Sequence, residues 1–427
     1  MTIFWMFIGL FAMILMGIPI AIALALVAVF AMIFTQGLDI LPNVALVMFD
    51  GATKFSLLAI PLFIFAGAIM NTGGISRRLI AFASALIGFV KGGLAMVSIA
   101  TSMFFAEMSG SAVADVAALG SILIPAMKKK GYPGPFAAAV MSSAATIAVI
   151  IPPSIPMILY AVMSDSSVVQ LFVAGIIPGV LCGLTMMALS YVFAVKRNYP
   201  VEEAFELGKL WRTFKSASWA FLLPVIILGG IFGGFVTATE GAGLAVVSAV
   251  AIGGLVYREL NWHHLREAVI DGGKSTAVVM LLVASSALVG TYLTELQVPQ
   301  KLAQQIMTFT SNPYAVLALL NIFFLIIGCF LHSAAAIILV VPIVMPLVNA
   351  VGIDPVHFGL VVTLNLGIGQ QTPPVASVLI TACSVAKADI WDVSKVNIFY
   401  IGVIFLILML VTYLPVVPMS LVRLFYG

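Results

Sequence analysis

The chain has 427 residues, of which 63% are hydrophobic and only 8% are charged, with 19 Lys and Arg against 16 Asp and Glu. Soluble domains carry roughly 25% charged residues, so this composition excludes an ordinary water-soluble globule. It is typical of a polytopic membrane protein, because each span needs about 20 mostly apolar residues. The small net charge of +3 gives no sign of a nucleic-acid partner, and we expect none.

The apolar opening segment, residues 3–34, precedes the first charged residue, Asp39. It has neither a basic start nor a small-residue cleavage site, so we expect it to stay in the mature chain. The three cysteines, Cys182, Cys329 and Cys383, all lie in apolar runs. They form neither a disulfide framework nor a metal-ligand spacing, and we interpret them as buried hydrophobic side chains.

Basic residues gather in a few segments, and such segments mark cytoplasmic loops. They are residues 128–130, Lys196 with Arg197, residues 209–215, and Arg258 with Arg266. Two apolar stretches, 219–235 and 241–256, flank a short turn, so the chain is predicted to cross the membrane there, turn outside and return. Glu240 in that turn is predicted to cap a helix. The polar segments 196–215 and 257–274 are predicted to be interfacial amphipathic connectors.

The sequence contains an internal repeat. At an offset of 221 residues, Pro125, Gly131, Pro152 and Pro153 match Pro346, Gly352, Pro373 and Pro374. A weaker match, at an offset of 223, relates Gly67, Arg78 and Leu79 to Gly290, Lys301 and Leu302. Lysines flank only the first copy, so the positive-inside rule predicts that the two copies have opposite orientations in the membrane.

Each copy holds an apolar stretch with small or polar residues at its centre. The first, residues 92–127, is centred on Ser109 and Ser111 and has basic residues at both ends, which predicts a re-entrant hairpin open to the cytoplasm. An arm of about 16 residues spans roughly 24 Å, less than the roughly 30 Å hydrocarbon core. The second, residues 313–348, should enter from outside, and its central residues are Gly328, Cys329, His332 and Ser333. The alternative is that the central serines only bond across packed helices.

Each hairpin precedes a predicted helix that a proline pair interrupts: Pro152 with Pro153, and Pro373 with Pro374. Proline lacks the backbone N–H, so the chain is predicted to unwind at both pairs. Unwound backbone at membrane depth is tolerated where it is buried or lines a cavity, and its carbonyls bind cations such as Na⁺. A simple kink or a span boundary is the alternative. The residues before the second pair favour binding, and they are Gly367, Gly369, Gln370, Gln371 and Thr372.

Several long motifs resemble the large membrane subunit of tripartite ATP-independent periplasmic (TRAP) transporters. They are residues 109–115, 120–132, 136–140, 151–156 and 171–179, and the resemblance covers essentially the whole chain. It implies an all-α polytopic fold of the ion-transporter-superfamily, elevator type, with an inverted repeat, two re-entrant helical hairpins and two Pro-broken helices. It also implies Na⁺-coupled import of a small organic anion across a bacterial inner membrane. The expected partners are a soluble periplasmic binding protein and a separate small membrane subunit of four helices.

The resemblance and the motif positions together indicate where Na⁺ and substrate bind. The first expected Na⁺ site combines Ser109 and Ser111 with carbonyls at Ile150 and Ile151. The second combines Gly328, Ser333, Gly367, Gly369 and Thr372. The expected substrate ligands are Ser154, His332, Gln370 and Gln371, because helix N-termini and polar side chains hold an anion without a formal charge. Neither hairpin tip contains an Arg or Lys.

The predicted domains are N-terminal scaffold helices (1–91), a first transport repeat (92–195), connectors and scaffold helices (196–311), a second transport repeat (312–390) and a C-terminal helix (391–427). The best substrate hypothesis is sialic acid, with a C4-dicarboxylate as the second. An ion or solute channel is the alternative function, because broken helices also build filters. An enzyme is excluded, since the four histidines form no H-E-x-x-H pattern and residues 268–275 lack the first glycine of a phosphate loop.

Overall fold

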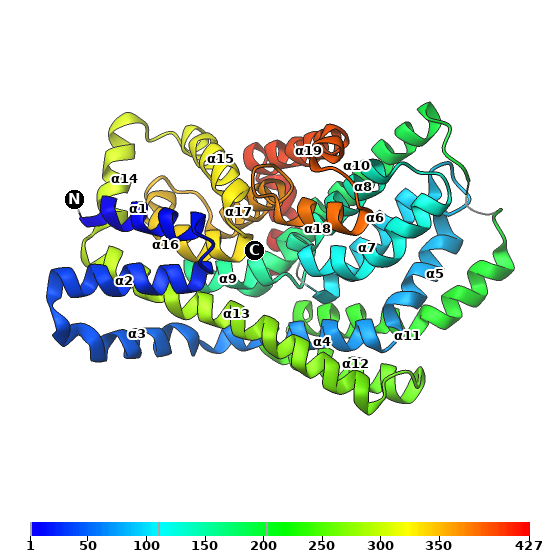
Figure 1. Ribbon diagram of the computed structural model, residues 1–427, viewed down its shortest axis with the longest axis horizontal. Helices are drawn as coiled ribbons and strands as arrows, with labels where there is room; N and C mark the ends of the chain where they lie inside the picture. Colours follow the sequence, from blue (N-terminus) through cyan, green and yellow to red (C-terminus); the bar gives the residue numbers. More distant parts are fainter. Residues whose placement is uncertain (1, 110–111, 202–203) are drawn as a thin grey trace.

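The computed structural model describes residues 2–109, 112–201 and 204–427, and these residues form helices and no strand. Eight helices of this described part are long and apolar enough to cross a membrane. Figure 1 shows the helices lying side by side in one elongated bundle. The chain is therefore the all-α polytopic membrane protein that its composition predicts.

The helices in chain order are α1 (Thr2–Leu15), α2 (Ile20–Gln36), α3 (Leu41–Ala52), α4 (Ala59–Thr72), α5 (Ile75–Ile87), α6 (Gly93–Ser109), α7 (Ala112–Lys129), α8 (Gly134–Thr146), α9 (Ile155–Ser164), α10 (Val168–Lys196), α11 (Leu207–Phe232), α12 (Ala238–Ala251), α13 (Trp262–Glu295), α14 (Val298–Phe309), α15 (Pro313–Phe330), α16 (Ser333–Ala350), α17 (Pro355–Gly369), α18 (Ser377–Ala386), α19 (Ile390–Tyr413) and α20 (Val416–Tyr426).

The repeat is visible in the helix boundaries themselves. At the offset of 221 the matching ends are Ser109 with Phe330, Ala112 with Ser333, Lys129 with Ala350, and Gly134 with Pro355. Gly131 and Gly352, which follow α7 and α16, both have a left-handed backbone, with φ of 87° and 73°. Only glycine adopts this conformation readily, so the same turn is built twice from the same residue type.

The weaker match at an offset of 223 is also structural. Helix α4 ends at Thr72 and α13 at Glu295, while α5 begins at Ile75 and α14 at Val298. Between them, Gly74 and Gln297 both have left-handed φ angles, of 76° and 55°. The duplicated unit therefore starts well before the hairpins and includes a helix, a tight turn and a second helix.

The two predicted hairpins are present, and they enter from opposite ends of the molecule. One consists of α6 and α7, and the other of α15 and α16. In Figure 1 the first pair (cyan) runs from the middle toward one end and the second (yellow) toward the other. Their arms have 17 or 18 residues, about 26 Å, which is a little less than the roughly 30 Å hydrocarbon core, although α15 and α16 are counted among the eight candidate spans.

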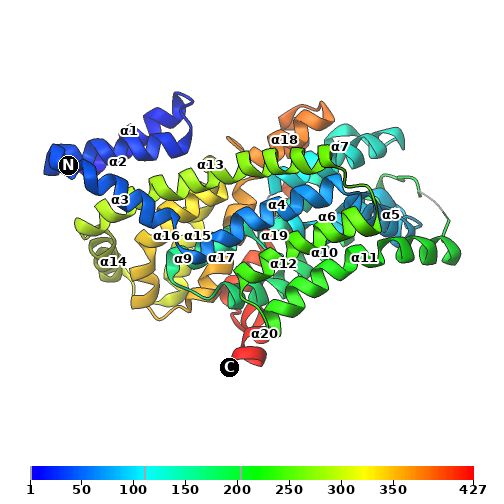
Figure 2. The same ribbon diagram turned by 90° about the horizontal axis from the view of Figure 1, so that it is seen from below.

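Both predicted broken helices are present as well. The first consists of α8 and α9, the second of α17 and α18, and both proline pairs contain a cis peptide bond. Helix α7 packs against α8 and α18, whereas α16 packs against α9 and α17, as Figure 2 shows from below. Each hairpin thus lies on one half of each broken helix, which interlocks the two copies.

Three predicted boundaries were wrong. The expected connectors 196–215 and 257–274 are not separate elements, because α11 already begins at Leu207 and α13 runs unbroken for 34 residues from Trp262. Once a helix has started, each further residue adds a backbone hydrogen bond, and in lipid an unpaired backbone is costly. The expected single C-terminal helix is two, α19 and α20, which meet at Pro415.

The turn before α12 is as predicted. Thr237 is the N-cap, its hydroxyl accepts a bond from the Glu240 N–H (3.2 Å), and the Glu240 carboxylate accepts one from the Thr237 N–H (2.8 Å). This reciprocal pair is a capping box and satisfies two backbone donors that the helix leaves free. Glu240 is therefore a helix cap.

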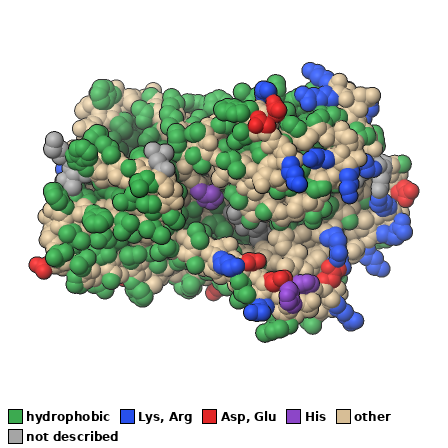
Figure 3. Space-filling model, viewed as in Figure 1, with side chains coloured by type: hydrophobic (Ala, Val, Ile, Leu, Met, Phe, Trp, Pro, Cys, Tyr) green, Lys and Arg blue, Asp and Glu red, His purple; other side chains and the backbone are tan. Residues whose placement is uncertain are grey.

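Charge is distributed unevenly along the long axis. Figure 3 shows Lys and Arg side chains (blue) gathered at the end of the molecule where α5, α7 and α11 lie, while hydrophobic side chains (green) dominate the opposite end. By the positive-inside rule, we expect the basic end to face the cytoplasm. The first hairpin opens toward that end and the second away from it.

This orientation predicts the result of side-specific labelling. In a variant without native cysteines, Lys129→Cys and Asn349→Cys place thiols at the open ends of the first and second hairpins, where both side chains are exposed. A membrane-impermeant maleimide added outside should label the cysteine at 349 and not the one at 129. Labelling of both from the same side would contradict the inverted orientation.

Candidate functional site

A cavity of about 210 Å³ lies where the hairpins, the first helix break and the two scaffold helices α4 and α13 meet. The transport repeats contribute Ala112, Ala114, Val149, Ile155, Pro156, His332, Ser333, Ala334 and Gln370 to its wall. The scaffold contributes Ile64, Gly67, Ala68, Asn71, Asp271, Gly272, Ser275 and Val279. The cavity is therefore bounded by the hairpins and helix breaks on one side and by α4 and α13, the first helices of the two repeat copies, on the other.

Three helices begin at this cavity. Helix α7 starts at Ala112, α9 at Ile155 and α16 at Ser333, and all three residues line the wall. The first N–H groups of a helix have no partner inside it, and the N-terminus carries about half a positive charge. The three helix N-termini therefore add positive potential to a cavity whose described lining side chains include no Lys or Arg and one carboxylate, that of Asp271.

The first break is held by Ser154. Its buried hydroxyl donates to the Val149 carbonyl (2.8 Å) and accepts from the Met157 N–H (3.4 Å), so it closes the break and caps α9. Among the described residues, no donor reaches the carbonyl oxygens of Ile150 and Ile151. The Ile150 carbonyl packs closely on Gly175 of α10, because a Cβ built there would overlap its oxygen, and neither Ile150 nor Ile151 lines the cavity.

The second break is shifted along the chain relative to the first, because α17 ends at Gly369 and α18 begins at Ser377, both later than the offset of 221 from Thr146 and Ile155 would place them. It is tied to the hairpin tip by the Val375 N–H, which donates to the Cys329 carbonyl (3.2 Å). The Thr372 hydroxyl donates to the Ile368 carbonyl (2.9 Å) and stays close to its own helix. Tip and break are therefore joined through the backbone.

Two of the predicted glycines allow backbones to approach closely. A Cβ built on Gly328 would lie 3.1 Å from Gly369 Cα, and one on Gly367 would lie 2.7 Å from Thr146 Cγ2. Larger residues would push the second tip or the first broken helix away. Gly328 and Gly367, both expected Na⁺ ligands, are therefore needed for the close approach of these backbones.

The predicted ligands do not all reach the cavity. His332, Ser333 and Gln370 line it, whereas Ser154, Gln371 and Thr372 do not. Ser109 is the last residue of α6, but its side chain, like the whole of Ser111, lies outside the described residues. Gln370 is 2% exposed, and within the described part of the chain its Oε1 atom has no hydrogen-bond partner.

Gln371 instead forms the centre of a buried network between the two copies. Its Nε2 donates to Thr146 Oγ1 (2.6 Å), and the Ser143 hydroxyl lies 2.8 Å from both Gln371 Oε1 and Asn397 Oδ1. The Asn397 amide also donates to the Gln371 carbonyl (3.3 Å). The side chain joins α8 of the first copy to the break of the second.

A second buried network holds the outer hairpin. Asn365 of α17 donates to Asn321 of α15 (2.6 Å), and Asn321 donates to Thr412 of α19 (3.2 Å). All three side chains are at most 3% exposed. Amides and hydroxyls that bond across apolar helices fix how these helices face one another.

Sequence reasoning missed the scaffold side of the cavity. Asn71 lies at the end of α4, and Asp271 and Ser275 lie on α13. The last two are four residues apart and therefore share one helix face, a signal that was available in the sequence. The sequence interpretation of residues 257–274 as an interfacial connector, and of 268–275 as a failed match to a phosphate loop, does not place this face at a cavity. The described residues contain no cluster of three or more His, Cys, Asp or Glu that would bind a transition metal.

Two hairpin tips, two breaks and a central cavity in an inverted repeat define a class of helical membrane transport proteins. The chain belongs to the family described as "Tripartite ATP-independent periplasmic transporter, DctM component", whose model matches residues 7–417. The resemblance noted in the sequence motifs is thereby confirmed. The relatives are named as permeases, and this chain is a transporter permease and not an enzyme.

Three relatives illustrate the range of the family. The isethionate TRAP transporter permease protein of Oleidesulfovibrio alaskensis is 41% identical over 96% of this chain, which spans 65% of that longer protein. The C4-dicarboxylate large permease of Vibrio cholerae is 36% identical over 100% of this chain and 99% of its own length. The sialic acid large permease of the same organism is 36% identical, over 98% of both chains.

Among solved structures, the YdaH transporter of Alcanivorax borkumensis has a similar fold. The TM-score is 0.63 at 14% sequence identity, over 88% of this chain and 89% of that one. At this identity the likeness concerns the fold alone.

The two adjacent glutamines should differ in their effect on stability. Gln371→Ala removes the bonds to the buried Thr146 and Ser143 hydroxyls, which keep the Ser142 carbonyl and Asn397 Oδ1 as partners, and the loss of such buried bonds costs about 1–3 kcal/mol. Gln370→Ala removes an Oε1 that has no partner in the described residues and one long bond to Leu366 O (3.5 Å). Thermal unfolding of the two purified variants should therefore show a clearly larger fall in Tm for Gln371→Ala. Equal falls in Tm for the two variants would contradict the role of the Gln371 network in stability.

Proposed function

We propose that the protein imports a small organic anion across a bacterial inner membrane, coupled to Na⁺ flowing inward, by an elevator movement. The observation that carries this proposal is the convergence of three helix N-termini, at Ala112, Ile155 and Ser333, on one cavity between transport repeats and scaffold. Helix N-termini are ready-made anion sites, and membrane transporters use the N-termini of broken helices in this way.

The proposed substrate is a carboxylate or a chemically similar anion. The named relatives are permeases for isethionate, C4-dicarboxylates and sialic acid, all of which are anions at neutral pH. His332 and Gln370 line the cavity at the second tip and break, and they are placed to contact the anionic group. Sialic acid and C4-dicarboxylates are both candidates, and the cavity volume of about 210 Å³ is small for the former.

The proposed coupling ion is Na⁺, held by oxygen atoms at the two tip-and-break pairs. A hard cation takes oxygen ligands, and unwound backbone supplies carbonyls for it. The unpaired carbonyls of Ile150 and Ile151 suit the first site, together with Ser109 and Ser111 from the tip. The proposed ligands of the second site are Gly328, Ser333, Gly367, Gly369 and Thr372.

The proposed movement carries both hairpins with their broken helices, roughly residues 92–162 and 313–386, past the remaining helices. The interlocked packing of α7 on α18 and of α16 on α9 supports a single rigid unit. Inverted repeats adopt two related packings around one site, which provides alternating access. The proposed fixed part includes α11 and α13, with Trp211 and Trp262 exposed near the membrane surface.

The proposed partners are a soluble periplasmic binding protein, which delivers the substrate, and a separate small membrane subunit of four helices. The description of the family as tripartite supports both. A channel remains the alternative function, and kinetics separates the two: a transporter gives saturable, Na⁺-stimulated uptake, whereas a channel gives conductance.

The Na⁺ proposal predicts a specific change in kinetics. Thr372→Ala removes one proposed ligand, so the Na⁺ concentration for half-maximal uptake should rise by about tenfold, with protein abundance unchanged. The measurement is uptake into proteoliposomes that contain the small subunit, with the binding protein added. Thr308→Ala, at an exposed position on α14, is the matched control. An unchanged Na⁺ dependence would remove this break from the coupling site.

The substrate proposal predicts a different change. His332→Ala removes an imidazole from the cavity wall but none of the proposed Na⁺ ligands, so the KM for substrate should rise by about tenfold while the Na⁺ dependence stays the same. His263→Ala, on the exposed start of α13, serves as the control. A rise in both the KM for substrate and the Na⁺ concentration for half-maximal uptake would instead indicate that His332 acts on the structure of the second tip.

A further inference from the structure

A second cavity, of about 380 Å³, lies at the basic end of the molecule between α5 and α11. Its wall consists of Arg78 and Ala81 from α5 and of Lys209, Arg212, Thr213 and Ser216 from α11. None of these residues lines the central cavity. The feature is therefore separate from the proposed transport site.

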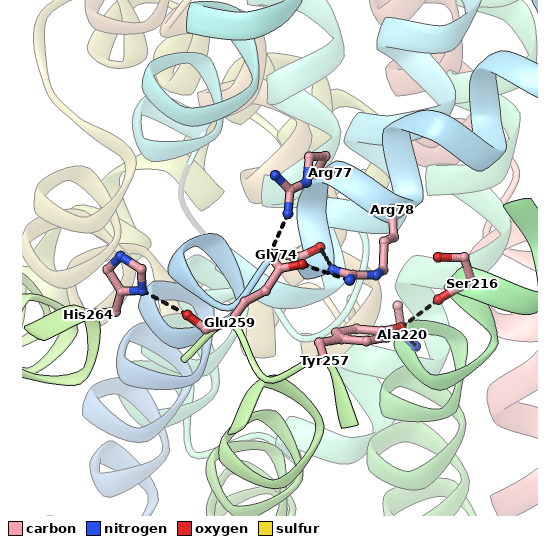
Figure 4. A network of polar contacts seen from close by, with 8 residues as sticks. All are labelled: Gly74, Arg77, Arg78, Ser216, Ala220, Tyr257, Glu259 and His264. Atoms are coloured by element: carbon pink, nitrogen blue, oxygen red, sulfur yellow. Dashed lines mark hydrogen bonds and ion pairs between the residues drawn. The ribbon is translucent and has the colours of Figure 1, made fainter. Parts of the chain in front are cut away.

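Arg78 is a fixed part of this wall. Its guanidinium group bonds to Glu259 Oε1 (2.7 Å) and to the Gly74 carbonyl (2.8 Å), and it lies 3.8 Å from the centre of the Tyr257 ring. Figure 4 shows this arrangement, with Arg77 reaching the same carboxylate. The side chain of Arg78 is only 20% exposed. It presents a positive charge that needs little ordering before it binds a ligand.

Tyr257 holds the other wall in position. Its hydroxyl donates to the Ser216 carbonyl (2.9 Å) and accepts from the Ala220 N–H (3.1 Å), which ties the end of α12 to α11. Burial raises the pKa of this phenol above its usual value, so the hydroxyl keeps its proton at neutral pH. The cavity is consequently built on a rigid frame of three segments.

The charge around the cavity is positive. One carboxylate, that of Glu259, is shared between Arg77 and Arg78. Lys209 and Arg212 stand in the first two turns of α11, where the helix end itself carries positive charge. Arg212 contacts no carboxylate within the described residues. Such a site favours an anion with several acceptor oxygens.

The surroundings indicate a lipid as the source of that anion. Trp211 is 66% exposed and stacks near Phe214, as aromatic side chains do at a membrane surface. Below them, Phe82 of α5 contacts Phe214 and Phe221 of α11, with ring centres 5.8 and 5.0 Å apart, which gives an apolar wall beneath the charged cavity. The basic end faces the cytoplasmic leaflet, which is rich in anionic lipids.

We propose that this cavity binds the phosphate headgroup of an anionic phospholipid from the cytoplasmic leaflet. The phosphate oxygens contact Arg78, Lys209 and Arg212, and an acyl chain lies along the aromatic wall of Phe82 and Phe221. Helices α5 and α11 both lie outside the proposed moving unit, and α5 leads directly into the first hairpin. The bound lipid therefore joins two fixed helices at their cytoplasmic side, next to the base of that hairpin.

The test measures the binding of phosphatidylglycerol to the full-length chain by native mass spectrometry in detergent. Each basic residue contributes about fivefold to the attraction of an anionic lipid, so Lys209→Gln with Arg212→Gln should weaken binding by about 25-fold. Lys215→Gln, on the same helix but outside the cavity wall, is the matched control and should bind like the unaltered protein. Ala81→Phe fills the cavity without changing any charge, and this variant should lose lipid binding altogether.

Four results would overturn the proposal. If Lys215→Gln weakened lipid binding as much as the double variant does, the lipid would be attracted to the whole basic surface and not to this cavity. Unchanged binding by Ala81→Phe would mean that the cavity is not the site. Binding of phosphatidylcholine as strong as that of phosphatidylglycerol would remove the requirement for negative charge. Thermal stabilisation by millimolar inorganic phosphate equal to that by the lipid would assign the site to free phosphate.

Discussion

The whole architecture depends on one constraint: a backbone N–H or C=O group inside a bilayer needs a partner, because lipid offers none. Two of the described helices are interrupted part-way along their length, one around Pro152 and Pro153 and the other around Pro373 and Pro374. At each break neighbouring groups replace part of the lost bonding, through the Ser154 hydroxyl in one copy and the bond from Val375 to the second hairpin tip in the other.

The interlocked packing of the copies follows from the same constraint. A hairpin that covered only its own broken helix would leave the far half of that helix exposed at the break. Because α7 also covers α18 and α16 also covers α9, each break is enclosed by elements of both copies. The contact of Gly367 with Thr146 and the Gln371 network then hold the two copies together, while the contact of Gly328 with Gly369 holds the second tip on its own broken helix.

The sequence was sufficient for features that recur or that follow from residue type. The proline pairs, the turn glycines Gly131 and Gly352 and the lack of Lys and Arg in the hairpins located both hairpins and both breaks to within a few residues. Partners across the fold could not be predicted: nothing in the sequence pairs Gln371 with Ser143 or Asn365 with Asn321. The prediction of two separate connectors was wrong because polar composition does not by itself end a helix. Helix α13 continues through its polar half.

The central claim is that the hairpins and broken helices move as one unit against the scaffold. Spin labels at Lys129→Cys, on the first hairpin, and Lys274→Cys, on α13, lie on the two sides of the proposed boundary, and both native side chains are exposed. In lipid nanodiscs the distance distribution between them should have two populations whose ratio shifts when Na⁺ and substrate are added. A pair within α13, Lys274→Cys with Glu295→Cys, should stay constant. A single, unchanging distance for the first pair, in a protein that still transports, would contradict the elevator.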